Sequence, residues 1–319
     1  MFSKYLSKFP YGYNPSDAQV KLIKEIEQAF NDGYRFVIAS APTGTGKSFV
    51  PRTLGNVSAR PTSEFKELVN SYAAYSQDFA GNFTNEAECL AEPSFGTFAL
   101  TITKQLQDQY KKLFDDIDLL KGKQNYLCDI DDSFDVDTAP CTYTKNLKND
   151  CWAKGCCNYY NNRNFALTSQ FAVLNYKMFL SLPGHVKRKN FLVCDEASEL
   201  EEELVRRFSA HIDYPRLNLN NVEHSILKSD KYDVQYRWLA NLIFNITETI
   251  ESLTSKNNNK IMTLSQPEAA RLKYLRNLHG NLTTVEQTWH KCEYIVDFTK
   301  NGVNFTPLKV NNLASSLFD

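Results

Sequence analysis

Residues 35–48, with the sequence RFVIASAPTGTGKS, constrain the fold of this chain more than any other stretch. Residues 36–39 are a short apolar run rich in aromatic and β-branched side chains, which predicts a buried strand. The turn that follows contains Gly44 and Gly46, which allow backbone N–H groups to face inward and bind phosphate oxygens at a helix start. Lys47 supplies a positive charge for the β- and γ-phosphates, and the Ser48 hydroxyl is a suitable Mg²⁺ ligand.

This arrangement predicts a P-loop that binds ATP with Mg²⁺, within an α/β fold built on a parallel sheet. A glycine-rich turn that binds nothing is the alternative, and the Lys-Ser pair directly after a strand argues against it. Ala41 stands where the motif has its first glycine. The predicted nucleotide-binding residues of the loop are Ala41, Pro42, Thr43, Gly44, Thr45, Gly46, Lys47 and Ser48.

A capped helix is predicted just upstream of the P-loop. Ser16 and Gln19 form a capping-box pattern, apolar side chains follow at helical spacing, and Gly33 is placed to end the helix. Gln19 has a second interpretation as a contact to the nucleotide base, the role of glutamines upstream of P-loops in helicases. It is therefore included among the candidate nucleotide-binding residues, with both interpretations open.

A second run, FLVCDEAS at residues 191–198, has the pattern of a buried strand followed by acids. Asp195 is a candidate Mg²⁺ ligand that acts through the water shell of the ion. Glu196 is a candidate base for the attacking water, since phosphoryl transfer depends mostly on positioning and charge stabilisation. Acids also favour helix N-termini for electrostatic reasons. The pair is informative because it follows a P-loop in the expected chain order.

Other segments predict the remaining architecture. Residues 98–102 (FALTI) predict a buried strand. At its carboxyl end, Thr101 and Thr103 either reach a ligand or act as ordinary caps. Two apolar-striped stretches, residues 239–253 and 265–290, flank a polar linker and predict an antiparallel helical hairpin. In residues 294–308, apolar and polar side chains alternate as in two strands joined by an Asn301-Gly302 turn.

Composition limits the class of protein. A chain of 319 residues with 42% apolar residues is long enough for two or three units with substantial cores. The 36 basic and 37 acidic residues nearly balance, so affinity for nucleic acid requires local basic patches. No apolar run reaches the length of a membrane span or a signal peptide, which predicts a cytosolic protein without a membrane partner.

Cysteines cluster in one part of the chain. Five of the eight lie within thirty residues: Cys128, Cys141, Cys151, Cys156 and Cys157. In a cytosolic protein this density predicts a site with four thiolate ligands, and both zinc and an iron–sulphur cluster accept four cysteines. The wide, irregular spacing favours iron, and buried cysteines without a metal are the alternative.

In this order the motifs resemble the amino-terminal half of the iron–sulphur DNA helicases of superfamily 2, the XPD/DinG type. APTGTGKS is similar to their Walker A motif, TITKQLQDQY to motif Ia, and DEAS to the DEAH box. KGKQNYLC at residues 121–128 and CNYYNNRNFA at residues 157–166 resemble the two ends of their iron–sulphur domain. The later helical hairpin resembles their arch domain.

The resemblance implies a RecA-like α/β motor domain with an inserted four-cysteine iron–sulphur domain and an inserted helical arch domain. The implied division is residues 1–120 and 166–200 for the first motor domain, 121–165 for the iron–sulphur domain, 201–295 for the arch, and 296–319 for the return to the motor. The family's next motif and second motor domain are expected after Asp319. The missing arginine finger then implies slow ATP turnover by this part alone.

The resemblance also implies ligands and roles. The [4Fe–4S] ligands are Cys128, Cys141, Cys151 and Cys157; Cys157 is preferred to Cys156 because it adjoins the tyrosine pair. Ser48 and Asp195 bind Mg²⁺, and Lys47, Asp195 and Glu196 act in ATP hydrolysis. Ser40, Asn158 and Ser198 depart from the family pattern, the last by replacing the histidine of the box.

The implied function is ATP-dependent helicase activity on DNA, with 5′ to 3′ translocation on single strands. Implied partners are single-stranded DNA or forks and the chain's own second motor domain, with the protein otherwise a monomer. The expected location is the bacterial or phage nucleoid in the cytoplasm, or a eukaryotic nucleus. Candidates for gripping DNA are Lys121, Lys123, Tyr126, Tyr160 and Arg163. The alternatives are a non-hydrolysing P-loop and metal-cluster module that binds DNA or a partner, and, less favoured, a P-loop nuclease with a zinc ribbon.

Overall fold

The computed structural model describes residues 3–42, 44–59, 96–144, 147, 151, 157–182, 187, 189–255 and 264–313. Its internal contacts divide the chain into two compact units. Unit 1 comprises Met1–Lys121 and Tyr160–Ala197, and unit 2 comprises Gly122–Tyr159 and Ser198–Asp319. The finer domain division that the sequence predicts stays a prediction.

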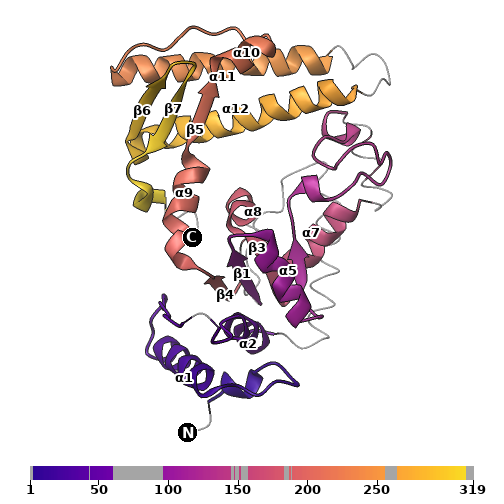
Figure 1. The fold of residues 1–319 in the computed structure, drawn as a ribbon, viewed down its shortest axis with the longest axis vertical. Coiled ribbons are helices and arrows are strands. Elements are labelled where there is room, and N and C mark those ends of the chain that lie inside the picture. Colours follow the sequence, from indigo (N-terminus) through magenta and orange to yellow (C-terminus); the bar gives the residue numbers. More distant parts are fainter. Residues whose placement is uncertain are drawn as a thin grey trace, which may run out of the picture. The chain divides into compact units, whose positions relative to one another are not determined.

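Unit 1 is built on a four-stranded sheet (Figure 1). Its strands are β1 (Thr97–Thr101), β2 (Asp118–Leu120), β3 (Phe171–Asn175) and β4 (Phe191–Cys194), in the order β2-β3-β1-β4. All three pairings are parallel. The strands β1 and β3 are continuous apolar runs with buried side chains, as expected when both faces of a parallel sheet are covered. The predicted α/β class with a parallel sheet is confirmed.

The buried strand predicted over residues 36–39 is wrong. These residues form no strand, and the side chains of Phe36 and Ile38 are 60% and 97% exposed. In the described part of the sheet, β4 is the last strand on its side. An extended segment without a neighbouring strand cannot satisfy its backbone hydrogen bonds inside a dry core, so residues 36–39 lie at the surface. Val37 alone packs against the apolar cluster of α1, α2 and β4.

The helices of unit 1 pack through two apolar clusters. They are η1 (Leu6–Lys8), α1 (Asp17–Asn31), α2 (Phe49–Val57), α5 (Lys104–Leu113), α7 (Asn158–Thr168, which begins in unit 2) and α8 (Tyr176–Ser181). One cluster joins Ile23 and Ile26 of α1 to Val50 and Leu54 of α2. The other joins α5 to the sheet through Tyr110, Ala99, Phe171 and Val173. Both helices next to the P-loop are thereby fixed to the sheet or to each other.

The predicted start of α1 is confirmed. The Ser16 hydroxyl accepts from the Gln19 N–H, and the Gln19 side chain accepts from the Ser16 N–H, which completes a capping box. Gly33 follows the helix with a φ of 88°, in the left-handed region that glycine adopts without strain.

Unit 2 contains a helical hairpin and a small antiparallel sheet (Figure 1). Its elements after residue 198 are α9 (Leu200–Phe208), β5 (Ala210–Asp213), α10 (Tyr214–Leu219), α11 (Tyr232–Ser255), α12 (Gln266–Cys292), β6 (Tyr294–Thr299), β7 (Gly302–Pro307) and η6 (Val310–Leu313). The predicted hairpin is confirmed, because α11 and α12 pack along each other. The predicted strand pair is also confirmed as β6 and β7.

The sheet of unit 2 has the order β5-β7-β6. The central strand β7 pairs with β6 on one side and on the other with β5, the strand that follows α9. Residues 294–307 therefore extend this sheet rather than the parallel one. Gly302 begins β7 where a Cβ atom would lie 2.0 Å from the Ile212 carbonyl oxygen, and the close pairing with β5 therefore requires glycine.

Trp289 of α12 is fully buried and stacks on Tyr294 at 5.4 Å between ring centroids.

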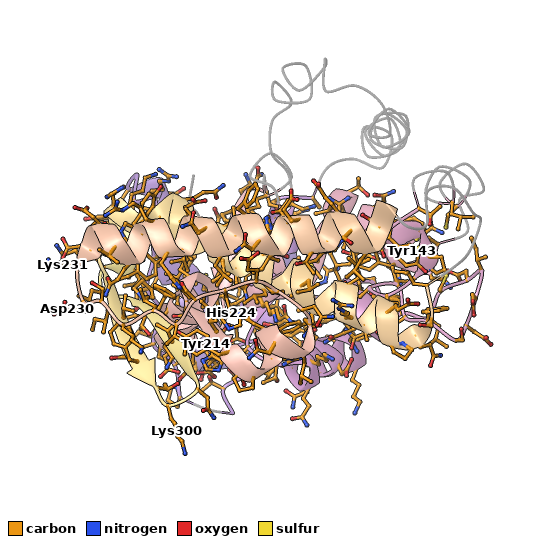
Figure 2. The ribbon with its side chains drawn as sticks, turned by 90° about the horizontal axis from the view of Figure 1, so that it is seen from above. Tyr143, Tyr214, His224, Asp230, Lys231 and Lys300 are labelled. Carbon is orange, nitrogen blue, oxygen red and sulfur yellow. The ribbon has the colours of Figure 1, made fainter. Side chains whose placement is uncertain are left out.

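The loop between α10 and α11 is held by aromatic contacts. The rings of Tyr214 and His224, both labelled in Figure 2, stack at 5.5 Å with an angle of 8° between their planes. The Tyr214 hydroxyl accepts a hydrogen bond from the Leu227 N–H, and Trp238 of α11 donates to the Ser225 carbonyl. These contacts fix residues 222–227 against the helical hairpin.

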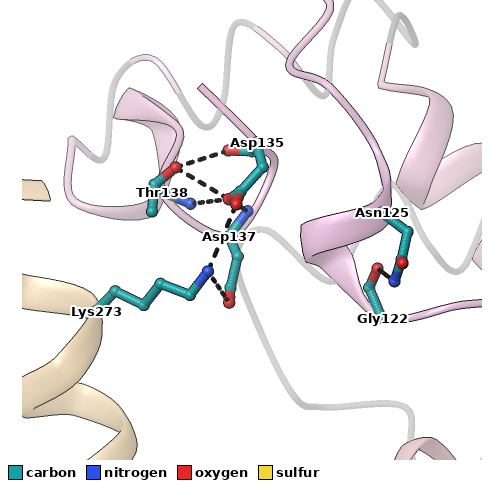
Figure 3. A network of polar contacts seen from close by, with 6 residues as sticks. All are labelled: Gly122, Asn125, Asp135, Asp137, Thr138 and Lys273. Carbon is teal, nitrogen blue, oxygen red and sulfur yellow. Dashed lines mark hydrogen bonds and ion pairs between the residues drawn. The ribbon is translucent and has the colours of Figure 1, made fainter. Parts of the chain in front are cut away.

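The cysteine-rich segment of unit 2 has little regular structure and is held by α12. It contains the short helices η2 (Lys123–Asn125) and η3 (Pro140–Thr142). The Lys273 ammonium lies 3.0 Å from the Asp137 carboxylate and 3.5 Å from that of Asp135, which also binds Thr138 (Figure 3). Arg276 donates to the Thr142 carbonyl at 2.9 Å. The acidic side chains of this segment are thus partly neutralised by basic side chains of α12.

In the described part of the chain, no helix combines the length and the apolar character that crossing a membrane requires.

Candidate nucleotide-binding site

The P-loop residues form a turn that leads directly into α2. Gly44 and Gly46 have φ values of 81° and 73°, in the left-handed region where glycine is favoured. The Phe49 N–H donates to the Gly46 carbonyl, and the Val50 N–H to the Lys47 carbonyl. The turn is closed further by the Thr45 hydroxyl, which donates to the Pro42 carbonyl at 2.8 Å. Thr43 lies outside the described residues.

Gln19 supports this turn from α1. Its Oε1 accepts from the Ser16 N–H at 2.9 Å, and its Nε2 donates to the Gly46 carbonyl at 3.0 Å. A Cβ atom on Gly46 would lie 2.4 Å from the Gln19 Nε2, so glycine is required for this approach as well as for the positive φ. The capping interpretation of Gln19 is confirmed, and the same side chain also holds the P-loop. Contact with a nucleotide base stays a prediction.

Asp195 and Glu196 form a tight turn after β4. The Asp195 N–H donates to the Leu100 carbonyl of β1 at 2.9 Å, and the Glu196 N–H donates to the Asp195 Oδ1 at 3.1 Å. Glu196 has a φ of 53°, which is a strained conformation for a residue other than glycine. The Lys47 ammonium lies 3.6 Å from the Glu196 carboxylate. The structure thus brings together the P-loop lysine and the predicted catalytic acid.

The electrostatics of this turn favour a bound cation. Burial, together with the adjacent Glu196 carboxylate, raises the pKa of Asp195, and Lys47 opposes the effect. A divalent ion would stabilise the ionised carboxylate. The Ser48 hydroxyl and the Asp195 carboxylate supply the hard oxygen donors that Mg²⁺ prefers, which it usually supplements with nucleotide phosphates and water. The donor set therefore fits Mg²⁺ bound with a nucleotide.

Two buried tyrosines complete the site, and the sequence analysis missed both. Tyr110 of α5 directs its hydroxyl to the Asp195 Oδ2 at 3.5 Å and has the Ser48 side chain as a neighbour. Tyr176 of α8 donates to the Asp195 carbonyl at 2.9 Å. Burial raises the pKa of both phenols, and the negative charge around Asp195 contributes, so both hydroxyls keep their protons. The signal available in the sequence was their place on helices that directly follow buried strands.

Thr103 is the N-cap of α5, where its hydroxyl accepts from the Leu106 N–H at 3.2 Å. For Thr103 the structure therefore supports the capping interpretation. Thr101 is the last residue of β1 and caps no helix; its hydroxyl donates to the Thr103 carbonyl at 3.3 Å.

The predicted cluster ligands Cys128, Cys141, Cys151 and Cys157 all lie in unit 2. Burial first, and then the thiols of Cys128 and Cys157, raise the pKa of Cys141, so these three are electrostatic neighbours. Among the described residues, however, no three His, Cys, Asp or Glu side chains are grouped closely enough to hold a metal ion. The described residues therefore show no site for a cluster, and the four-cysteine site stays a prediction from the resemblance. Cys156 lies outside the described residues.

The candidate DNA-gripping residues have intramolecular contacts. Lys121 forms an ion pair with Asp108 at 2.7 Å. The Lys123 ammonium lies 5.8 Å from the centroid of the Tyr159 ring, and Tyr126 packs edge-on against the same ring at 5.4 Å. Tyr160 and Arg163 lie on α7 and are partly buried. The structure therefore makes Tyr159, which the sequence analysis did not name, the centre of this aromatic and basic group.

Comparison with known proteins adds a distant structural similarity. No model of a protein family matches this chain, and no curated protein sequence matches it. A solved structure described as an XPD helicase aligns with 82% of this chain at 12% identity and a TM-score of 0.39. The alignment covers 57% of that protein, so this chain spans just over half of its length.

Proposed function

We propose that unit 1 binds ATP with Mg²⁺ and hydrolyses it. The observation that carries this proposal is the meeting of the P-loop and the acidic turn, where Lys47 and Glu196 lie 3.6 Å apart. Two segments separated by most of unit 1 in the sequence thereby supply a phosphate-binding turn, a cation, and two carboxylates at one place. A chance glycine turn offers no reason for this convergence.

In this proposal each residue has a separate task. The backbone N–H groups around Gly44 and Gly46 bind phosphate oxygens at the N-terminus of α2. When nucleotide binds, the Lys47 ammonium leaves its ion pair with Glu196 and pairs with the β- and γ-phosphates. Glu196 is then available to orient the attacking water. Ser48 and Asp195 hold Mg²⁺, which neutralises the charge on the phosphates when it is bound. Gln19 keeps the loop in its binding conformation.

We propose further that the chain is the first motor part of an ATP-dependent DNA helicase that moves 5′ to 3′ on single-stranded DNA. Support comes from the motif order in the sequence and from the α/β sheet that carries the site. Basic side chains beside aromatic rings are the kind of surface on which single strands stack, and the candidates for binding DNA stay those named from the sequence: Lys121, Lys123, Tyr126, Tyr160 and Arg163. Tyr159 is 5% exposed, so its ring packs against Lys123 and Tyr126 and is not itself open to a base.

The [4Fe–4S] cluster is part of the same proposal and rests on the sequence alone. Its ligands are Cys128, Cys141, Cys151 and Cys157, and the described structure does not gather three of them. The test is iron, zinc and sulphide analysis of protein purified without oxygen. About four irons per chain support a cluster. A single zinc, or no metal, rejects it.

A second function is a P-loop module that binds DNA or a partner without hydrolysis. Ser198 favours it, because the resembled box has a histidine at this position. The two functions differ in how DNA and nucleotide affect each other. An ATPase motor predicts that ATP changes the affinity for single-stranded DNA, whereas the module predicts no coupling.

The decisive experiment measures binding of a fluorescent ATP analogue to the chain, with Mg²⁺ and with EDTA. The proposal predicts binding that Mg²⁺ strengthens and that Lys47→Ala weakens. Lys21→Ala is the matched control, because Lys21 is an exposed lysine of α1 away from the loop. Nucleotide affinity that is equal in wild type and Lys47→Ala would reject the assignment of the site.

A further inference from the structure

The hydroxyl of Tyr110 connects the two residues proposed to hold Mg²⁺. It lies 3.5 Å from the Asp195 Oδ2, and the Ser48 side chain is its neighbour on the P-loop side. Ser48 belongs to the P-loop and Asp195 to the turn after β4. Tyr110 comes from a third segment, α5, and no sequence motif assigned it to the site.

The ring of Tyr110 is held rigidly. The residue is 1% exposed and packs in one apolar cluster with Phe114, Ile117, Phe171 and other sheet residues. Its ring centroid lies 6.3 Å from that of Phe171 and 6.4 Å from that of Phe114. Because these contacts fix the ring, the position of the hydroxyl is set by the core of unit 1 rather than by the P-loop.

Both hydrogen-bonding partners have the chemistry of a metal site. Ser48 is the N-cap of α2, yet its hydroxyl makes no capping hydrogen bond, so it is available to the neighbouring Tyr110 and to a cation. A hydroxyl that ligates a cation must direct its proton to an acceptor and keep a lone pair for the ion. The phenol oxygen of Tyr110 is such an acceptor.

The carboxylate of Asp195 is oriented from two sides. Its Oδ1 accepts from the Glu196 N–H at 3.1 Å, and its Oδ2 faces the Tyr110 hydroxyl. Because a carboxylate oxygen accepts and a phenol O–H donates, Tyr110 is the donor in this contact. The carboxylate plane is thereby fixed, and the remaining lone pairs are available to a cation or to its water shell.

We infer that Tyr110 is a positioning residue for Mg²⁺: Ser48 donates to the phenol oxygen, the phenol donates to Asp195, and both ligands are aimed at one cation. This inference rests on the proposed nucleotide-binding function and deepens it. Tyr110 touches neither the phosphates nor the cation. Its loss should therefore change the dependence of binding on Mg²⁺ and not the intrinsic affinity for the nucleotide.

The test compares wild type with Tyr110→Phe, which removes only the hydroxyl. Binding of a fluorescent ATP analogue is titrated with Mg²⁺, and repeated in EDTA. The expected result is an Mg²⁺ requirement raised by about tenfold, the range for partners that orient metal ligands, with binding in EDTA changed less than about twofold. Tyr214→Phe is the control, because it removes a hydrogen-bonded hydroxyl from unit 2.

A double-mutant cycle gives a second readout. Ser48→Ala removes one of the two contacts of the phenol, so Tyr110→Phe should raise the Mg²⁺ requirement by a smaller factor in the Ser48→Ala background than in wild type, because only the contact with Asp195 is then left to lose. Additive effects, or an unchanged Mg²⁺ requirement in Tyr110→Phe, overturn the inference. If the wild-type protein binds no nucleotide, that result rejects both the proposed function and this inference. If wild type shows Mg²⁺-dependent binding that Tyr110→Phe retains in full, only the inference falls.

Discussion

The Lys47 ammonium lies 3.6 Å from the Glu196 carboxylate, across the gap between the P-loop and the turn after β4. Lys47 thus forms an ion pair with Glu196, the residue proposed to orient the attacking water. Nucleotide phosphates would attract Lys47 away from Glu196, and the carboxylate would then be released to its catalytic position. In the proposed function, nucleotide binding and activation of the acid would be coupled through this one ion pair.

Lys47→Ala should weaken binding of ATP by about 10- to 100-fold, the usual range for one charge-assisted hydrogen bond. The loss should be smaller for ADP, because the lysine serves the γ- as well as the β-phosphate. Titration of fluorescent ATP and ADP analogues measures both. Equal losses for the two nucleotides would contradict the proposed position of Lys47.

Glu196→Gln should separate binding from hydrolysis. The variant loses the partner that competes for Lys47 and loses a negative charge near the phosphates, so ATP should bind up to about fivefold more tightly. Single-turnover hydrolysis should fall by about 100-fold or more, since the amide cannot accept a proton from water. Glu201→Gln, at an exposed glutamate of α9, is the control. Hydrolysis that survives in Glu196→Gln would require another base.

Gln19→Ala should distinguish support of the loop from recognition of the base. The Gln19 side chain holds the Gly46 carbonyl at 3.0 Å, so its loss loosens the phosphate-binding turn. We expect affinities for ATP and GTP to fall by the same factor, about fivefold for one neutral hydrogen bond. Competition titrations with the two nucleotides give the ratio. A loss confined to ATP would instead show that Gln19 reads adenine.

Lys273→Met should loosen the cysteine-rich segment from α12. Its ammonium pairs with Asp135 and Asp137, and all three side chains are half-buried. Amide hydrogen exchange across residues 129–138 should accelerate by about two- to fivefold, the range for partly exposed ion pairs. Lys291→Met, at an exposed lysine of the same helix, should leave exchange there unchanged. Equal protection in both variants would show that the apolar contacts alone hold the segment.

Lys189 should give unit 1 a pH-dependent stability. Burial lowers the pKa of Lys189 to about 7, while the Asp118 carboxylate opposes the shift. The unfolded chain then binds more protons than the folded chain between pH 7 and the ordinary lysine pKa of about 10.5. The free energy of unfolding contributed by this group therefore rises with pH across that window, by up to about 1.4 kcal/mol per pH unit.

Lys189→Met should flatten this dependence. Urea unfolding followed by circular dichroism at several pH values between 7 and 9.5 measures the slope for wild type and variant. The variant should gain most at pH 7, where the folded protein still carries part of the buried charge. Lys21→Met, whose side chain is 78% exposed, should retain the wild-type slope. A wild-type slope in Lys189→Met would mean that other groups set the dependence.

Local patterns predicted the elements that depend on neighbouring residues. The capping box at Ser16 and the hairpin of α11 and α12 follow from short-range spacing. The turn predicted at Asn301-Gly302 is off by one residue: Thr299 pairs with Gly302, so the loop between β6 and β7 is Lys300-Asn301. The strand at residues 36–39 has an equally clear local pattern and was wrong, because a strand also needs a neighbour with which to share its hydrogen bonds. Nothing in the segment itself specifies that neighbour.

The sequence by itself determined the chemistry of the P-loop and of the Asp-Glu turn, since phosphate and Mg²⁺ binding require particular residue types at fixed local spacing. Only the tertiary structure decided how these residues meet. Tyr110 and Asp195 are 85 residues apart, and the parallel order of β1 and β4 brings them together. The physical reason is that side chains oriented by a packed core depend on the register of strands and on burial, and both emerge only when distant segments fold onto one another.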